Sequence, residues 1–362
     1  MEENFKCANC GGEIAFDPKK QKLVCKYCLS EFAVGDVAQN DNIFLMYSDD
    51  LKYEGCKDAK RLYKCNICKT HLASCDDMDM VRCPSCGSVD LSKSQANGIH
   101  PMNIIPFALS KNQAAEIFQK WIKSRKFAPN DLKKMAKLKK LSGMYIPLYG
   151  FNLDARTSYS ATGVDLEEYE DSEGRRKTRV KDRDYVSDVE HRTFENFLVS
   201  ANKNVQAKVI KKFGGYNLEG IKKYSTNYML GFIGVGTDIN VQEAYELAKK
   251  GVAQEEHSRI YSQLNVKYDR VDFFNSSTTV DNVFNAYYYA PIWANHYKYK
   301  NKEYHCYING QTGKIYGKAP KSLRKIFGLI FGILAGLASI VAFYFIIFLL
   351  VGSLGPALYF NM

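Results

Sequence analysis

The sequence lacks the short motifs that mark the common classes of enzyme. A phosphate-binding loop needs four residues between its glycines and a hydroxyl residue after its lysine, whereas Gly310 and Gly313 are separated by two residues and Ile315 follows Lys314. The six histidines form no HExxH cluster, no Gly-x-Ser-x-Gly elbow occurs, and the glycines between 231 and 236 reverse the dinucleotide-binding spacing. We therefore expect a protein that is not an enzyme, although a site assembled from scattered residues would leave no motif.

A basic-then-apolar leader is also absent from the N-terminal segment. With eleven cysteines in the chain, this absence argues against secretion and against a disulfide framework. We expect reduced thiols in a cytoplasmic compartment.

Eight of the eleven cysteines fall into two sets that share one spacing, C-x2-C, fourteen residues, C-x2-C, at a constant offset of 58 residues. The predicted metal ligands are Cys7, Cys10, Cys25 and Cys28 in the first set and Cys65, Cys68, Cys83 and Cys86 in the second. The x2 spacing lets one turn aim two thiolates at one ion, and two turns complete the tetrahedral shell that zinc accepts. We expect two structural zinc ions with no open position for hydrolytic chemistry; the alternative is free or disulfide-linked thiols.

The other metal-binding side chains have simpler interpretations. Cys56, Cys75 and Cys306 are expected to be buried or spare thiols rather than redox groups. His71 lies inside the second set, where it could replace a ligand or belong to a surface loop.

Both predicted ribbons are slightly acidic. Residues 1–36 contain five lysines against six acidic residues, and residues 62–90 contain three basic residues against four acidic ones. Since phosphate contacts supply most non-specific affinity for nucleic acid, docking onto a protein is the better prediction for the ribbons.

The last part of the chain is apolar. No charged residue occurs between 326 and 362, and residues 326–350 form an almost unbroken apolar run. Twenty-five residues of helix span about 37 Å, more than the roughly 30 Å hydrocarbon layer, so a single transmembrane helix is predicted. Basic residues precede this span and none follows it, so the soluble part is expected to be cytoplasmic and the protein to lie in the cell membrane.

Within the span, Gly328, Gly332 and Gly336 recur at every fourth residue, on one helical face. Such a stripe is typical of helices that self-associate or pair with another membrane helix, although glycine is common in transmembrane helices in any case.

The region between the ribbons and the span combines helical and strand patterns. Ser110 and Gln113 form a capping box before an amphipathic helix, Asn240 is expected to cap a helix that ends near Gly251, and alternation over residues 151–159 and 296–308 predicts antiparallel meanders. The run from 165 to 183, first acidic and then basic, is expected to form a solvated hairpin tip or a loop.

Two segments, 145–149 and 289–293, share the form Tyr-x-Pro-aliphatic-aromatic, each before a predicted strand. Either the region has two related halves, or proline at a strand edge or bulge explains both.

The predicted fold is therefore α+β and multidomain. Its segments are zinc ribbon 1 (1–38), a connector (39–61), zinc ribbon 2 (62–90), a linker (91–98), a central α+β domain (99–320), a transmembrane helix (326–351) and a short extracytoplasmic tail (352–362).

Much of the excess positive charge lies in one window. Residues 111–140 contain ten Lys or Arg residues against Glu116 and Asp131. On a tethered protein such a cluster is placed to contact anionic lipid; a solvated face and a nucleic-acid site are the alternatives.

The paired CxxC motifs, the Tyr-Ile-Pro-Leu-Tyr and Ala-Pro-Ile-Trp segments, residues 304–318 and the terminal apolar run together resemble bacterial TFIIB-type zinc-ribbon membrane proteins. Members are often labelled primosomal replication factor or helicase-like, a label that finds no support in this sequence because motor motifs are missing. The resemblance implies membrane residence and partners of the SPFH (flotillin-like) or phage-shock type. The sequence thus favours a membrane-anchored adaptor, with a membrane-tethered nucleic-acid-binding protein as the alternative.

Overall fold

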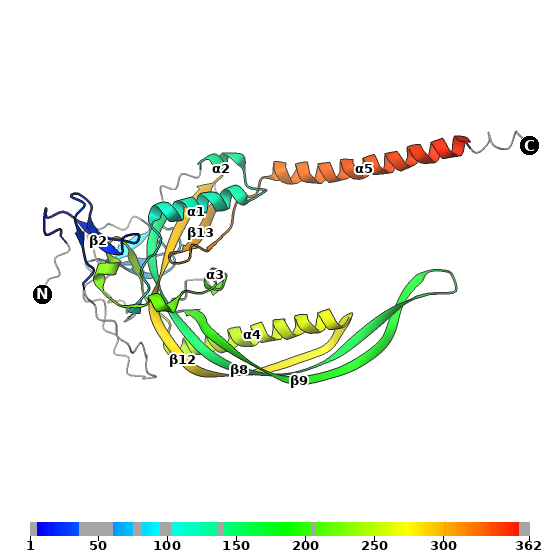
Figure 1. Cartoon of the computed structure of the whole chain (residues 1–362), viewed down its shortest axis with the longest axis horizontal. Helices are drawn as coiled ribbons and strands as arrows, with labels where there is room; N and C mark the ends of the chain where they lie inside the picture. The colour runs from blue at the N-terminus through cyan, green and yellow to red at the C-terminus, as the bar shows by residue number, and fades with distance from the viewer. Residues whose placement is uncertain are drawn as a thin grey trace, which may run out of the picture.

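The fold is described from a computed structural model of the chain (Figure 1). The structure describes residues 6–35, 61–74, 82–94, 103–135, 141–204, 207–300 and 302–354.

Strands predominate over helices. The strands are β1 (Ile14–Asp17), β2 (Lys22–Cys25), β3 (Glu31–Phe32), β4 (Arg61–Cys65), β5 (His71–Ser74), β6 (Leu91–Lys93), β7 (Asn103–Ile104), β8 (Leu141–Glu170), β9 (Arg176–Ser200), β10 (Lys222–Lys223), β11 (Ile233–Val235), β12 (Arg270–Tyr299), β13 (Lys302–Asn309) and β14 (Ile315–Gly317). The helices are α1 (Lys111–Ser124), α2 (Asn130–Met135), α3 (Ala207–Phe213), α4 (Val241–Lys267) and α5 (Leu323–Leu354), with short 3-10 turns η1 (Leu218–Gly220) and η2 (Thr226–Met229). The prediction of a mixed α+β fold is confirmed.

The described strands form two sheets. β1, β2 and β3 make a small antiparallel sheet, and the other eleven strands make one large sheet with β12 and β8 at its centre. The large sheet includes β4, β5 and β6 of the second cysteine module, because β5 pairs with β11 of the central region. The second module is thus continuous with the central sheet.

The two proline motifs pair with each other at the centre of this sheet. In the antiparallel register of β8 and β12, Pro147 lies opposite Tyr289 and Pro291 lies opposite Tyr145. On its other side β8 changes neighbour from β11 to β9 around Pro147, and β12 changes from β7 to β13 around Pro291. Each proline therefore lies where one strand pairing ends and the next begins. At this point the missing backbone N–H of proline removes no hydrogen bond between strands. The motifs lie inside the strands, which begin earlier than predicted, and the two halves have the same local arrangement.

β8, β9 and β12 continue beyond the body as a long curved arm (Figure 1). β8 and β12 have 30 residues each, and register shifts interrupt the arm at Asp272/Asn275 and Asn282/Phe284. Such bulges bend and twist a ribbon. The arm ends in a hairpin in which Asp171 accepts hydrogen bonds from the backbone N–H of Glu173 and Arg175 (3.0 Å each), so the predicted solvated hairpin tip is confirmed.

α4 covers one face of the arm. Its buried residues recur at every fourth position, and they are Ala244, Ala248, Val252, Glu256, Ile260 and Leu264. Glu256 is 1% exposed and accepts from Arg192 Nη1 (2.9 Å) and Arg259 Nη2 (2.7 Å), so the buried carboxylate is paired. The prediction that this helix ends near Gly251 is wrong. One helical glycine costs only about 1 kcal/mol, and Gly251 lets the ring of Phe197 approach.

The predicted linker at 91–98 is wrong for its first residues, because Leu91 to Lys93 form β6 and pair with β4. Residues 95–98, the connector at 39–60 and the end of the tail from 355 lie outside the described residues.

α5 leaves the body as a single rod (Figure 1) and runs three residues beyond each end of the predicted span. It is long and apolar enough to cross a membrane by length and composition, and none of the described span is buried against the protein. Ser322 N–H donates to Phe127 O (2.8 Å), and Lys325 Nζ donates to Ala128 O (2.7 Å), so the root of α5 rests on the α1–α2 connection.

Candidate metal centres

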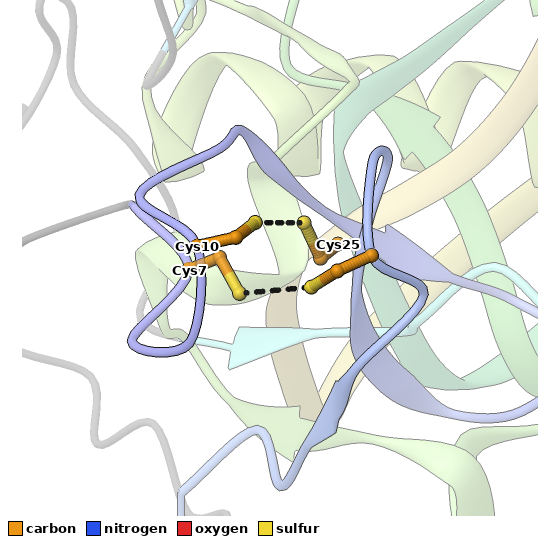
Figure 2. Close-up of side chains that lie close together, drawn as sticks. Cys7, Cys10 and Cys25 are labelled. Atoms are coloured by element: carbon orange, nitrogen blue, oxygen red, sulfur yellow. Dashed lines mark hydrogen bonds between the residues drawn. The ribbon is translucent and has the colours of Figure 1, made fainter.

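The structure brings each predicted set of four cysteines into one cluster. The four Sγ atoms of Cys7, Cys10, Cys25 and Cys28 lie within 4.8 Å of one another, and so do those of Cys65, Cys68, Cys83 and Cys86. In the first cluster Cys7 lies 3.5 Å from Cys28 and Cys10 lies 3.5 Å from Cys25 between Sγ atoms, and Figure 2 shows the two loops facing each other. In the second cluster the corresponding Sγ distances are 3.6 Å and 3.7 Å.

These distances fit a tetrahedral thiolate shell. A metal–sulfur bond of about 2.3 Å gives a tetrahedron with edges of about 3.8 Å. Both clusters can therefore hold one metal ion with all four positions filled by sulfur.

Four copies of one turn make the two clusters. The backbone N–H of the first cysteine in each CxxC donates to the carbonyl five residues later, at Gly12, Ser30, Thr70 and Ser88 (2.7–3.0 Å). The residue after the second cysteine has a left-handed φ in every copy, and these residues are Gly11 (+70°), Leu29 (+61°), Lys69 (+61°) and Gly87 (+82°). We refer to each of these turns as a knuckle.

The surroundings of the sulfurs act on their pKa in opposite directions. Ser30 Oγ lies 3.1 Å from Cys28 Sγ, and this hydroxyl is the main cause that lowers the pKa of Cys28 to about 6. In the second cluster Cys68 Sγ lies 3.1 Å from Thr70 Oγ1, whereas burial raises the pKa of Cys86 to about 11. A bound cation would stabilise all four thiolates in both clusters, because it repays the cost of burying their charge.

The second cluster is held against the β12–β13 hairpin by side chains that the sequence analysis did not select. His296 Nε2 lies 2.7 Å from Pro84 O, His296 Nδ1 lies 2.5 Å from His305 Nδ1, and Tyr307 donates to Ser85 O at 3.1 Å. Burial lowers the pKa of His296. A neutral His296 that donates to Pro84 O must accept from His305, which fixes both tautomers.

The first cluster is attached differently. Phe16 of β1 stacks edge-on against Tyr228 (5.2 Å between ring centroids), and its N–H donates to Leu230 O at 3.1 Å. Gln21 Nε2 donates to Phe107 O at 2.8 Å. Core packing and single hydrogen bonds therefore dock this module, whereas the second is docked by strand pairing as well as by side chains.

A glycine comparison tests the contact between His296 and the second cluster. Replacing Gly11 with alanine places a side chain at a left-handed φ with no atom within 4 Å of the new Cβ, so we expect a loss of about 1 kcal/mol in unfolding free energy. Replacing Gly87 with alanine adds contacts of 3.0 Å with His296 Cγ and Nδ1, so we expect about 2–3 kcal/mol.

The thermal unfolding of metal-loaded protein, compared between these two variants and the wild type, measures the difference. Equal losses in the two variants would contradict a tight contact between Gly87 and His296.

The remaining candidate ligands stay apart from the clusters. Cys306 is fully buried in the core, as expected of a spare thiol, and Cys56 and Cys75 lie outside the described residues. His71 belongs to β5, and among the described residues it joins neither cysteine cluster.

Exposed apolar side chains lie in the second and third knuckles and directly after the fourth, and the sequence analysis did not select them. These tip residues are Tyr27 (72% exposed), Leu29 (69%), Ile67 (64%) and Val89 (63%). Tyr27 and Ile67 occupy the same position in their CxxC motifs. Apolar side chains at this position would have been a usable sequence signal, because a knuckle is too short to bury them.

Comparison with known proteins finds a distant relative but does not assign the chain to a family. No family model matches the chain, and no solved structure matches it. The chain is 27% identical over 344 residues to a Bacillus subtilis (strain 168) protein named "Uncharacterized protein YdjG", across 92% of this chain and 94% of the relative. The similarity therefore extends well beyond the two metal-binding modules.

Proposed function

We propose that the chain is a non-catalytic, membrane-anchored adaptor whose two zinc-holding modules dock partner proteins at the cytoplasmic face of the membrane. The observation that carries this proposal is the set of tip residues, four apolar side chains exposed on or directly beside turns that a metal ion would hold rigid. Rigid, exposed aromatic and aliphatic groups lose little entropy on binding and are frequent anchors of protein interfaces.

Zinc is the ion that we propose for both clusters. Four thiolates in a tetrahedron select zinc or iron among common metals, and zinc brings no redox chemistry. With every position filled by sulfur, the ion would fold the knuckles rather than react.

α5 is the proposed anchor. Arg324 and Lys325 lie in its first turn and no Lys or Arg follows within the chain, which supports a cytoplasmic position for the body. The stripe of Gly328, Gly332 and Gly336 is a proposed contact with a second membrane helix.

Insertion of α5 constrains the arm. Figure 1 shows α5 and the arm extending toward the same end of the molecule. The tip of the arm carries exposed charged side chains such as Arg175 and Lys177, and it is energetically costly to place such charges in the hydrocarbon layer of a membrane. Among the described residues, Ser322 and Lys325 at the start of α5 bond to the body and the span beyond them is not buried against it, so we infer that this short connection sets the angle between the inserted helix and the arm.

Flotillin-like (SPFH) and phage-shock-type membrane proteins are the partners that we propose to test first. The support is the resemblance of the sequence to TFIIB-type zinc-ribbon membrane proteins, together with the slightly acidic modules, which are poorly suited to grip nucleic acid.

Co-purification from detergent-solubilised membranes tests the adaptor function. We expect the double variants Tyr27→Ser/Leu29→Ser and Ile67→Ser/Val89→Ser each to lose at least tenfold of a specific co-purifying protein, because interface anchors contribute about 2 kcal/mol or more. Both variants should keep the metal content of the wild type, since none of these residues is a ligand.

Tyr185→Ser is the matched control, because Tyr185 is also 72% exposed but lies on β9 of the arm. It should keep the full set of co-purifying proteins. The proposal is wrong if the set is the same for the wild type and all three variants.

A further inference from the structure

Where α5 joins the body, basic residues gather with almost no acidic residue among them. Residues 120–135 and 318–325 together contain ten Lys or Arg residues against one acidic residue, Asp131. Asp131 already accepts from Tyr299 Oη, at 2.9 and 3.0 Å to its two carboxylate oxygens. The exposed members form what we call the basic root surface, which consists of Lys120, Lys123, Arg125, Lys126, Lys318, Lys321 and Arg324.

The packing of α1 against the core determines which way its basic side chains point. Its buried residues are Ala114, Phe118, Trp121 and Ile122, and Phe118 and Trp121 belong to the core cluster that includes Trp293. The helix cannot roll without exposing these side chains, so Lys120 and Lys123 must point outward. Arg125 lies over the ring of Trp121 (4.7 Å from the guanidinium carbon to the centroid), which restrains its side chain at the end of the helix.

The two halves of the surface are tied to each other. Besides its bond to Ala128 O, Lys325 Nζ donates to Asn130 Oδ1 at 2.7 Å, and Ser322 N–H donates to Phe127 O at 2.8 Å. The α1–α2 connection therefore stays beside the first turn of α5.

The basic residues near the start of α5 have a defined depth relative to the membrane if α5 is inserted. The apolar run begins at Ile326, directly after Lys325. If α5 crosses the membrane, Lys321 and Arg324 lie at the level of the lipid headgroups, and the bonds of Ser322 and Lys325 keep Arg125 and Lys126 beside them.

We propose that the basic root surface binds anionic phospholipid headgroups. This inference rests on the proposed anchoring by α5 and deepens it, because it assigns a lipid class and the residues that recognise it. Lys and Arg donors match the phosphate oxygens of such headgroups, and a partner with the opposite charge is present wherever the anchor inserts. Nucleic acid is the rival occupant, and it would have to share a surface that the anchor holds against the bilayer.

The experiment uses the full chain in nanodiscs that contain equal amounts of phosphatidylglycerol and phosphatidylcholine. Native mass spectrometry counts the lipids of each kind that stay bound after release. We expect the wild type to retain phosphatidylglycerol in excess. Each basic residue at an anionic surface raises affinity about fivefold at low salt, so Arg125→Gln/Lys126→Gln/Arg324→Gln should lower this preference by about a hundredfold.

The control removes the same charge from the arm. Arg176, Lys181 and Arg183 are exposed on β9, and Arg176→Gln/Lys181→Gln/Arg183→Gln should keep the preference of the wild type. The proposal is overturned if the wild type retains phosphatidylglycerol and phosphatidylcholine in the same ratio as the disc contains them. It is equally overturned if the arm variant loses the preference for phosphatidylglycerol as strongly as the root variant. It is also overturned, in favour of nucleic acid, if the root variant loses only the low-salt binding of an oligonucleotide. A chain that never enters the discs contradicts the anchoring itself, which is a different result from insertion without lipid preference.

Discussion

Replacing Cys7 with serine is expected to remove one of two zinc ions per chain, and replacing Cys65 to remove the other. Each cluster has four sulfurs and no spare ligand among its described neighbours, so three thiolates leave an incomplete shell with much weaker affinity. Elemental analysis of purified protein should give two zinc ions for the wild type, one for each single variant and none for the double variant.

Cys306→Ala is the matched control, because it removes a buried thiol that belongs to neither cluster. It should keep both ions. Two ions in Cys7→Ser or in Cys65→Ser would contradict the assignment of the ligands.

Loss of zinc from the first cluster and loss of zinc from the second should also differ in their effect on the stability of the protein. Zinc binding contributes about 10–16 kcal/mol to the folding of such modules. Loss of the ion should lower the stability of the body only as far as the body's own contacts require the folded module. β5 pairs with β11 inside the large sheet, whereas no described strand of the first module pairs with the body, which the module joins through a shared core that includes Phe16 and Leu23. We expect Cys65→Ser to lower the unfolding temperature of the body more than Cys7→Ser does, and Cys7→Ser to make its own module sensitive to protease before the large sheet unfolds.

Ending the chain after Lys325 is expected to move the protein from the membrane to the soluble fraction. The truncation removes the apolar run but keeps the bonds of Ser322 and Lys325 to the α1–α2 connection, so the body should fold as before. Apolar residues contribute about 0.3–0.6 kcal/mol each to insertion, so the apolar run from 326 to 350 provides on the order of 10 kcal/mol. Fractionation after a high-salt wash measures the change.

Ser339→Ala is a suitable control for the truncation, because the Ser339 hydroxyl bonds only to Ala335 O within α5 (2.8 Å). This variant should resist the salt wash as the wild type does. Recovery of the wild type in the soluble fraction would contradict anchoring by α5, and retention of the truncated chain after the wash would show that another surface suffices.

Features encoded by neighbouring residues were predictable from the sequence. The four CxxC motifs are local, so their spacing alone identified the eight residues that the structure gathers into two clusters. The capping box of Ser110 and Gln113 was predictable for the same reason, since both partners lie within one helical turn. The end of α4 was not, because Phe197, from a distant strand, fills the space beside Gly251 and the packing of α4 on the arm outweighs the low helix propensity of glycine.

The sequence by itself determined the two tetrathiolate clusters, the α+β class and the apolar terminal helix, because spacing and composition specify them without reference to distant residues. Only the tertiary structure decided how the second module joins the central sheet, where His296 contacts Pro84, and which residues stand beside the root of α5. These features depend on pairings between segments up to 212 residues apart, such as that of His296 with Pro84, and many alternative pairings share the same local patterns.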